Sequence, residues 1–171
     1  MRKIILGVAV SLDGFIEGPN GEYDWCFTDQ DYGMSDFFKR VDAVFMGRKS
    51  YELTKNMKAG GEAMPVMTSY VFSNTLTELE NDSILVTGDI RQQVTDIKNQ
   101  EGKDIWLFGG ASLTSSMMNL GLVDEFWLSI HPILLGSGKP LFTGINKKIS
   151  LKLVDTKTYS TGLVSCVYLP K

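Results

Sequence analysis

Apolar residues occur along this chain in short runs that are separated by polar, glycine-rich segments. Residues 3–11 (KIILGVAVS) form the first run, and its nearly continuous apolar character predicts a strand that is buried on both faces. The next segment, residues 12–25, is rich in Gly, Asp and Asn and predicts a long loop. Further strands are expected at residues 42–46, 65–73, 83–87 and 104–108, and helices are expected to end near Arg40, Asn56, Gln100 and Leu120.

The pattern changes after Val123. Residues 125–133, 150–158 and 163–169 have the character of strands, and no helical pattern separates them. Alternation of strands and helices favours a mainly parallel sheet, and the final strands favour an antiparallel edge. The expected fold class is therefore α/β with a mixed sheet, in which the last strands also offer a dimer surface.

The composition fits one domain, residues 1–171, because 171 residues leave little room for a second core and 43% of them are hydrophobic. The 17 Lys and Arg residues against 20 Asp and Glu residues provide no broad basic surface, so nucleic-acid binding is not expected. No apolar stretch approaches the roughly 18 residues of a membrane span, and the N-terminal run is too short for a signal peptide. We therefore expect no membrane partner and a cytoplasmic protein.

The residues do not indicate metal chemistry. Cys26 and Cys166 stand far apart, and neither belongs to the Cys-x-x-Cys pattern of a zinc site. His131 is the only histidine, and no cluster of carboxylates accompanies it in the sequence. No resident metal is expected.

A glycine follows the strand expected at residues 42–46. Gly47 permits close approach of the backbone, and the helix that begins there presents unpaired N–H groups with a partial positive charge, which suits a phosphate. Arg48 and Lys49 add charge, and Ser50 adds a hydroxyl group. An ordinary helix start with solvated basic residues would explain the same sequence, because glycine is common at such turns.

Gly109 and Gly110 repeat this arrangement after the strand expected at residues 104–108, and Ala111 and Ser112 open the next helix. The pattern differs from the G-x-G-x-x-G fingerprint, and a tight packing turn would also account for it. Ligands of open α/β sheets bind beyond the carboxyl ends of the strands. A dinucleotide that spans both glycine turns is therefore the simplest interpretation.

A third strand end carries Ser73 and Asn74. Their uncharged donors, beside Arg48, would suit the 2′-phosphate that separates NADP from NAD. An ordinary β-turn that contains Asn needs no ligand to explain the same residues.

Five segments, taken in order, carry a family likeness: AVSLDGFIEG (9–18), VFMGRKSYE (44–52), FSNT (72–75), WLFGGASL (106–113) and VDEFWLSIHPILLGSGKPLF (123–142). They resemble the dihydrofolate-reductase-like superfamily, and within it the C-terminal reductase domain of bifunctional riboflavin-biosynthesis enzymes. The likeness spans essentially the whole chain. Its S-L-D-G, G-R-K-S-Y and P-x-L-L-G-x-G-x-P-L-F elements are specific when they occur together.

The resemblance implies a three-layer α/β/α sandwich, often a homodimer, that binds NADPH across the carboxyl edge of its sheet. It implies reduction of a small heterocyclic substrate, as in 5-amino-6-(5-phosphoribosylamino)uracil reductase. On the cofactor side it implies contacts to the nicotinamide from Ala9, Val10, Phe15 and Ile16, to the phosphates from Gly47, Arg48, Lys49, Ser50, Ser73 and Asn74, to the adenine from Thr87 and Gly88, and to the pyrophosphate from Phe108, Gly109, Gly110, Ala111, Ser112 and Leu113. On the substrate side we expect Asp13 as the catalytic residue and Trp25, Asp36, His131 and Lys139 as binding residues.

Two departures from the family patterns leave the substrate open. Dihydrofolate reductases carry a carboxylate on the helix after the first loop, whereas here neither Asp31 nor Asp36 aligns without a gap. Riboflavin enzymes usually add a zinc deaminase domain with H-x-E and P-C-x-x-C motifs, which this sequence does not contain. A pterin or folate reductase and a non-catalytic nucleotide-binding dimer remain as alternatives.

The chemical roles of three residues also have simpler alternatives. Asp13 would hydrogen-bond or protonate the substrate, although Asp-Gly is a common turn pair. His131 would act as a general acid, or it is a strand histidine packed against its neighbours. Lys139 lies in residues 134–142, which either close over the substrate, with the lysine meeting a substrate phosphate, or form a surface hairpin.

Overall fold

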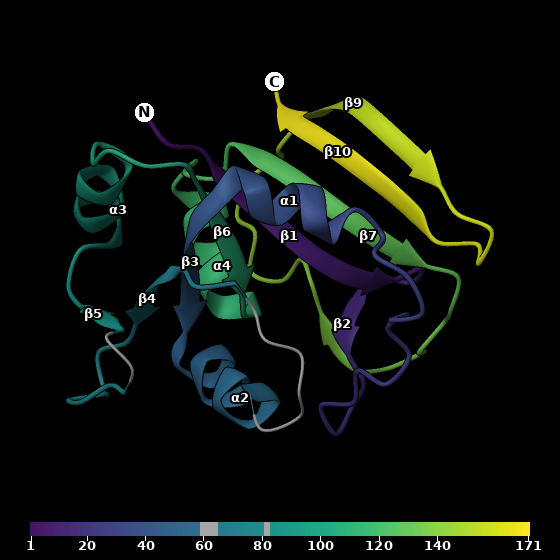
Figure 1. The fold of residues 1–171 in the computed structure, drawn as a ribbon, viewed down its shortest axis with the longest axis horizontal. Coiled ribbons are helices and arrows are strands. Elements are labelled where there is room, and N and C mark those ends of the chain that lie inside the picture. The colour runs from purple at the N-terminus through teal and green to yellow at the C-terminus, as the bar shows by residue number, and fades with distance from the viewer. Residues whose placement is uncertain (59–64, 81–82) are drawn as a thin grey trace.

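The computed structural model describes residues 1–58, 65–80 and 83–171, and these residues form one large sheet with helices on both faces (Figure 1). The strands of this sheet are β1 (Ile4–Ser11), β3 (Val41–Gly47), β4 (Thr68–Phe72), β5 (Ile84–Val86), β6 (Asp104–Gly109), β7 (Glu125–His131), β9 (Leu151–Thr158) and β10 (Val164–Pro170). The helices are α1 (Met34–Arg40), α2 (Arg48–Lys58), α3 (Ile90–Lys98) and α4 (Ala111–Asn119). None of these helices is long and apolar enough to cross a membrane.

The strand order is β5-β4-β3-β6-β1-β7-β10-β9. The six strands from β5 to β7 in this order pair in parallel, whereas β10 pairs antiparallel to both β7 and β9. A parallel neighbour requires a crossover connection, and an antiparallel neighbour does not. The sequence-based prediction of a mixed, mainly parallel sheet with antiparallel C-terminal strands is confirmed.

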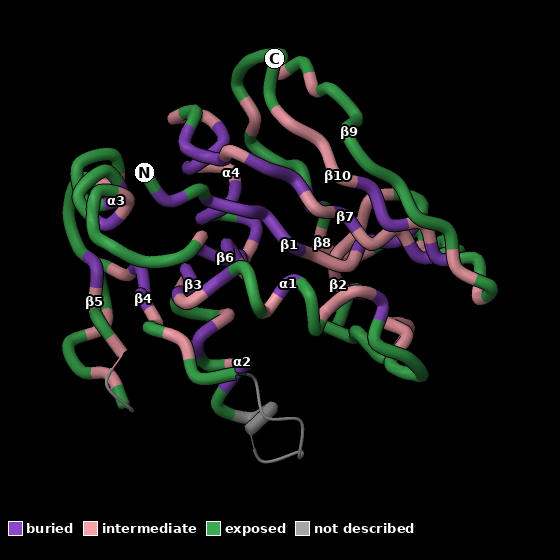
Figure 2. Tube along the Cα trace, turned by 45° about the horizontal axis from the view of Figure 1, so that its top comes forward, coloured by how far each residue is buried: buried purple, intermediate pink, exposed green. Residues whose placement is uncertain are grey.

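The sheet separates two apolar clusters. Helices α3 and α4 contribute Val94, Ile97 and Met117 to the larger cluster, which also contains Leu6 and Phe45 from the central strands. Helices α1 and α2 cover the opposite face through the smaller cluster, to which they contribute Phe37 and Tyr51. The fold is therefore a three-layer α/β/α sandwich. Figure 2 shows buried backbone in the central strands and an exposed outer strand, β9.

One prediction of irregular structure was wrong. The segment expected to be a continuous loop contains β2 (Phe15–Glu17), which pairs antiparallel with β8 (Lys139–Pro140) in a separate small sheet. The Leu141 N–H also donates to the Gly14 carbonyl oxygen at 2.9 Å. Strands of two or three residues show no hydrophobic alternation, so their pairing was not visible in the sequence.

Phe45 anchors the part of β3 that leads to Gly47. Its side chain is fully buried, and its ring centroid lies 5.0 Å from that of Phe72 and 5.6 Å from that of Tyr70. We expect Phe45→Ala to lower the free energy of unfolding by about 3–5 kcal/mol, because it removes these contacts and leaves a cavity. Urea denaturation measures the change. Leu134→Ala, at a residue that is 70% exposed, should change it by less than about 0.5 kcal/mol, and similar losses in both variants would contradict this role of Phe45.

Candidate functional site

The carboxyl ends of β3 and β6 bring the two glycine turns together. Both strands run in the same direction and pair directly, so Gly47 and Gly109 end them at the same edge of the sheet. A Cβ atom on Gly47 would lie 3.8 Å from the Gly109 carbonyl oxygen and 3.8 Å from Leu113 Cβ. The peptide bond between Gly109 and Gly110 is cis. The two turns lie side by side, as the interpretation of a shared ligand requires.

A cavity of about 450 Å³, here called cavity A, opens at the ends of β3, β4, β5 and β6. Arg48 and Lys49 supply the cations of the α2 start, and the α4 start has no side-chain cap on Gly110. Unpaired N–H groups at a helix start favour anions. Many residues that the sequence assigned to the cofactor line this cavity, together with Lys139: Gly47, Arg48, Lys49, Ser50, Ser73, Asn74, Thr87, Gly88, Gly110, Ala111, Ser112 and Leu113.

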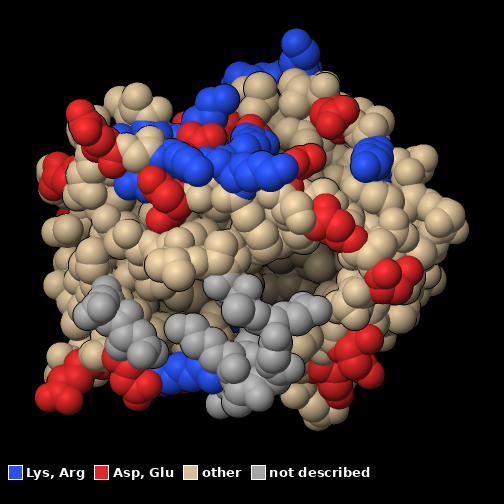
Figure 3. Space-filling model, in the orientation of Figure 1, with Lys and Arg blue, Asp and Glu red and all other residues tan. Residues whose placement is uncertain are grey.

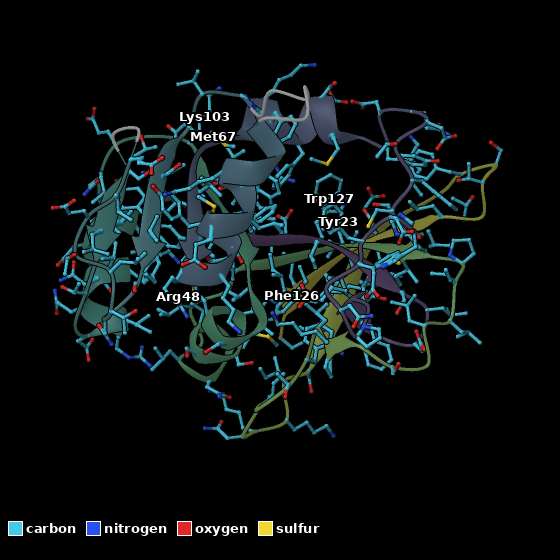
Figure 4. All side chains as sticks on the ribbon, turned by 90° about the horizontal axis from the view of Figure 1, so that it is seen from below. Tyr23, Arg48, Met67, Lys103, Phe126 and Trp127 are labelled. Atoms are coloured by element: carbon cyan, nitrogen blue, oxygen red, sulfur yellow. The ribbon has the colours of Figure 1, made fainter. Side chains whose placement is uncertain are left out.

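A second cavity of about 570 Å³, cavity B, lies beside it between β1, α1, α2 and the segment at residues 16–32. Of the predicted residues it contains Ala9, Ile16, Ser50, Phe108, Gly110, His131 and Lys139. In Figure 3 a hollow opens on the face shown, and its visible wall consists of uncharged residues. Figure 4 shows Tyr23 and Trp127, which both line cavity B, close to each other. Arg48, which begins α2 and lines cavity A, lies apart from them.

The two cavities meet at three residues. Ser50, Gly110 and Lys139 belong to the lining of both. A Cβ atom on Gly110 would lie 3.3 Å from Ser50 Oγ and 3.9 Å from Lys139 Nζ, so a larger residue would crowd this passage. Lys139 Nζ in turn lies 3.2 Å from Glu17 Oε1. One extended ligand can therefore contact both cavities.

Sequence reasoning missed most of the aromatic wall of cavity B. Trp106, Trp127 and Phe38 were not among the residues expected to bind a ligand, and in the segment at residues 23–32 only Trp25 was expected to contact the substrate. That segment supplies seven other residues to the lining: Tyr23, Cys26, Phe27, Thr28, Gln30, Asp31 and Tyr32. An aromatic residue on a strand has the same sequence signal whether it meets a helix or a cavity. The only available clue was the unusual number of aromatic residues in and after the first loop.

Asp13 lies outside the lining of both cavities and holds a loop instead. Its carboxylate accepts hydrogen bonds from the Ser11 hydroxyl at 2.6 Å, the Gly136 N–H at 2.8 Å and the Leu135 N–H at 3.2 Å. The Ser11 hydroxyl and these backbone N–H groups hold the pKa of Asp13 below its usual value. The carboxylate thus ties residues 134–136, next to β8, to the end of β1.

His131 lines cavity B as a neutral side chain that joins two segments. Its Nδ1–H donates to the Ser129 carbonyl oxygen at 3.0 Å, which leaves Nε2 to accept the Phe27 N–H at 3.1 Å. Burial lowers the pKa of His131, and the rings of Trp25 and Phe27 lie 5.3 and 5.0 Å from its own. Both ring nitrogens are engaged by backbone, which suits the packed strand histidine better than the general acid, the two roles that the sequence left open.

Five other predicted residues lie outside both linings. Asp36 is 84% exposed on α1 and forms an ion pair with Lys39 at 2.8 Å. It therefore lies away from both cavities, and this position does not support the expected substrate contact. Val10 points into the larger apolar cluster because side chains alternate along β1. Trp25, Phe15 and Gly109 lie next to lining residues, namely His131, Ile16 and Gly110.

Among the residues that the structure describes, no group of three or more His, Cys, Asp or Glu side chains is placed to hold a metal ion. The arrangement that is present combines a cationic, hydroxyl-rich cavity with an aromatic one. It suits a phosphate-bearing ligand that extends toward a flat, apolar molecule.

The sequence model of the RibD C-terminal domain matches residues 2–165. The chain belongs to the RibD C-terminal domain family. A Bacillus subtilis (strain 168) member, described as uncharacterized protein YyaP, is 49% identical over an aligned length of 177. The aligned region covers 98% of this chain and 94% of that protein. The predicted resemblance to the reductase domain of riboflavin-biosynthesis enzymes is confirmed.

Solved structures extend the likeness of this family member. A putative riboflavin biosynthesis protein from Shewanella sp. PV-4 superposes with a TM-score of 0.87 at 27% identity, covering 100% of this chain and 99% of that chain. A Thermotoga maritima deaminase/5-amino-6-(5-phosphoribosylamino)uracil reductase gives 0.74 at 15% identity, covering 99% of this chain and 57% of that chain. Enterococcus faecalis dihydrofolate reductase, complexed with NADP(H), gives 0.72 at 12% identity, covering 99% and 96%. The last two show the shared fold.

The neutral state of His131 predicts how stability depends on pH in this member of the RibD C-terminal domain family. An unfolded histidine has a pKa of about 6.5. Because the folded pKa is lower, the unfolded state takes up a proton first, and stability present above about pH 6.5 is lost as the pH falls toward the folded pKa. We expect the wild type to lose more free energy of unfolding between about pH 7.5 and about pH 5.5 than His131→Gln does, as measured by urea denaturation. Equal losses would show that His131 is not buried in its neutral form.

Proposed function

We propose that this chain is an NADPH-dependent reductase, in which cavity A holds the adenosine and phosphate groups of the cofactor and cavity B holds a small heterocyclic substrate. The observation that carries the proposal is the junction at Gly110, where a cationic cavity and an aromatic cavity share Ser50 and Lys139. When bound, NADPH would supply the hydride. The protein would supply orientation and exclusion of water, which is what hydride transfer mainly needs.

The residues of cavity A fit the cofactor. The guanidinium group of Arg48 forms an ion pair with Glu52, which lies on the same helix at 3.2 Å. This exposed ion pair contributes little to stability, so a phosphate can replace Glu52 as the partner of Arg48. Lys49 and Ser112 place a cation and a hydroxyl group at the starts of α2 and α4. Ser73 and Asn74 follow β4 on the Arg48 side of the cavity, where they suit a 2′-phosphate. Gly110 leaves room for a pyrophosphate because a Cβ atom there would already contact Ser50.

The residues of cavity B suit a reacting ring. Ala9 and Ile16 line cavity B, where they would pack against the nicotinamide. His131 and Trp25 would act indirectly, by fixing the segment that carries Phe27. Asp13 would likewise act by holding residues 134–136 near Lys139. The wall itself would keep water from the hydride path.

The known proteins support this proposal. The Enterococcus faecalis enzyme of the same fold is named as a complex with NADP(H), and the Thermotoga maritima protein is named as a uracil-derivative reductase. A pterin or folate reductase is the second candidate, favoured by one observation: the Asp31 side chain is part of cavity B. Both candidates predict that NADPH binds, and they differ in the ring that is reduced.

The direct test is titration of the purified protein with NADPH and, separately, with NADH. A cofactor at one hundred times its Kd should raise the free energy of unfolding by about 2.7 kcal/mol, which a thermal or urea melt detects. We expect a larger rise with NADPH than with NADH at the same concentration. The absence of any rise with either nucleotide would contradict the reductase proposal and favour a non-catalytic dimer. If NADPH binds, loss of its absorbance with pyrimidine and pterin compounds decides between the two candidates.

Arg48 is the residue expected to distinguish the two nucleotides. We expect Arg48→Ala to weaken NADPH binding by about 10- to 100-fold, because a hydrogen bond to a charged group contributes about 1.5–3 kcal/mol, and to leave NADH binding nearly unchanged. Calorimetry or nicotinamide fluorescence measures both affinities. Lys152→Ala, which removes the same charge from the outer strand β9, is the control and should leave both affinities unchanged. Equal weakening of NADPH and NADH by Arg48→Ala would show that Arg48 does not contact the 2′-phosphate.

A further inference from the structure

The aromatic wall of cavity B presents ring surface and keeps its polar edges inside the protein. Trp106 donates its indole N–H to the Gly7 carbonyl oxygen at 2.8 Å, and Trp127 donates its own to Ser165 Oγ at 2.7 Å. Phe37 packs behind both indoles, with ring centroids 5.5 Å from Trp106 and 4.5 Å from Trp127. Trp106 is only 6% exposed and belongs to the smaller apolar cluster, whereas Trp127 is half-buried and packs against that cluster. Because its N–H group is engaged inside the fold, Trp127 offers a ligand ring surface rather than a hydrogen-bond donor, and a planar ring can stack on such a surface.

The charged side chains described in cavity B are already paired. Lys139 faces Glu17 at 3.2 Å between their charged atoms, and these side chains are 33% and 32% exposed, less than the 45% and 49% of the Arg48–Glu52 pair. Asp31 accepts hydrogen bonds from the Ser35 hydroxyl at 2.6 Å, the Ser35 N–H at 2.9 Å and the Gly33 N–H at 3.1 Å, at the start of α1. The Ser35 hydroxyl and these N–H groups hold the pKa of Asp31 below its usual value, so its carboxylate stays ionised and engaged. Recruiting either group for a ligand would break an existing interaction.

Uncharged polar groups complete the wall. Thr28, Gln30 and Ser129 contribute hydroxyl and amide groups to the lining. Such groups can read the edge of a neutral ring, as carbonyl and N–H groups of a pyrimidine or pterin require. By contrast, Arg48 and Lys49 belong to cavity A. Among the residues that the structure describes, Lys139 at the junction is therefore the one lysine or arginine that lines cavity B, whereas Arg48 and Lys49 add two more cations to cavity A.

We propose that the substrate of cavity B is a neutral planar heterocycle without a phosphate group, so that it differs in charge from the phosphoribosyl compound named for the Thermotoga maritima reductase. The proposal rests on the function proposed above and specifies its substrate class. A phosphate monoester carries about 1.5 to 2 negative charges at neutral pH. Moving this group from water into a mainly aromatic cavity costs desolvation free energy. Lys139 already has Glu17 as its partner, so no new ion pair would compensate for that cost.

The experiment compares two probes with the same ring: 5-amino-6-(5-phosphoribosylamino)uracil and the same compound without its phosphate. Binding of each is measured by calorimetry and by quenching of tryptophan fluorescence, with and without saturating NADPH. We expect the phosphate-free compound to bind at least about tenfold more tightly and to be the one that oxidises NADPH. Equal or tighter binding of the phosphate-bearing compound would overturn the proposal. Failure of both compounds to bind below about 1 mM would overturn it as well.

A variant pair tests the charge argument itself. Glu17→Gln leaves Lys139 without its carboxylate partner, and we expect it to reduce the preference for the phosphate-free compound by at least about threefold. Glu52→Gln is the matched control, because it removes the partner of Arg48 in cavity A and should leave the preference unchanged. An unchanged preference in Glu17→Gln would contradict the argument that this pair excludes phosphate.

The two proposals fail in different ways. Binding of NADPH is measured in its own titration, and its absence would remove the reductase proposal. The preference between the two probes is also measured without NADPH, so that it reports on cavity B alone. A protein that binds NADPH but prefers the phosphorylated probe would keep its proposed function and lose the inferred substrate class.

Discussion

The structure depends on the direct parallel pairing of β3 and β6. This pairing ends both strands at one edge of the sheet, and two helices begin immediately after them, α2 at Arg48 and α4 at Ala111. Gly109 ends β6 with a φ of 110°, a conformation that favours glycine, whereas a Cβ atom on Gly47 would make only ordinary contacts at 3.8 Å. Every other feature of the candidate site is arranged around the space between these two starts. The buried side of β3, where Phe45 packs among aromatic neighbours, keeps that edge in place.

The sequence predicted the strands of the main sheet because most of them are apolar runs with a clear boundary, although the outer strand β9 is largely exposed. It also predicted most of the lining of cavity A, partly because glycine, basic and hydroxyl residues after strands have a local chemical signature and partly through the family resemblance. It failed for β2 and β8, whose pairing joins residues more than 120 positions apart in the chain and involves only short segments. Local patterns carry no information about such contacts.

Cavity B was predicted less completely for a related reason. Its wall combines residues of the central strands, such as Trp106, with a segment held by contacts to distant parts of the chain, among them the hydrogen bond from the Phe27 N–H to His131 and the 3.1 Å contact between the Tyr32 and Thr161 hydroxyl groups. Asp13 and His131 were predicted to act on the substrate, and the structure shows each in contact with backbone of a distant segment. A polar residue that organises a loop and one that touches a substrate have the same appearance in a single sequence. Only the direction of the side chain separates them.

The position of Lys139 has a consequence for how proteins of this fold diversify. This lysine enters the junction from β8, which is held by β2 and by the loop that Asp13 fixes, whereas the rest of cavity A is built from the ends of the main sheet. Cavity B, in contrast, takes much of its wall from residues 16–32. Substitutions in that segment can change which ligand cavity B binds, while cavity A keeps its shape. A single scaffold of this kind can therefore acquire new chemistry piecemeal, by exchange of one connecting segment.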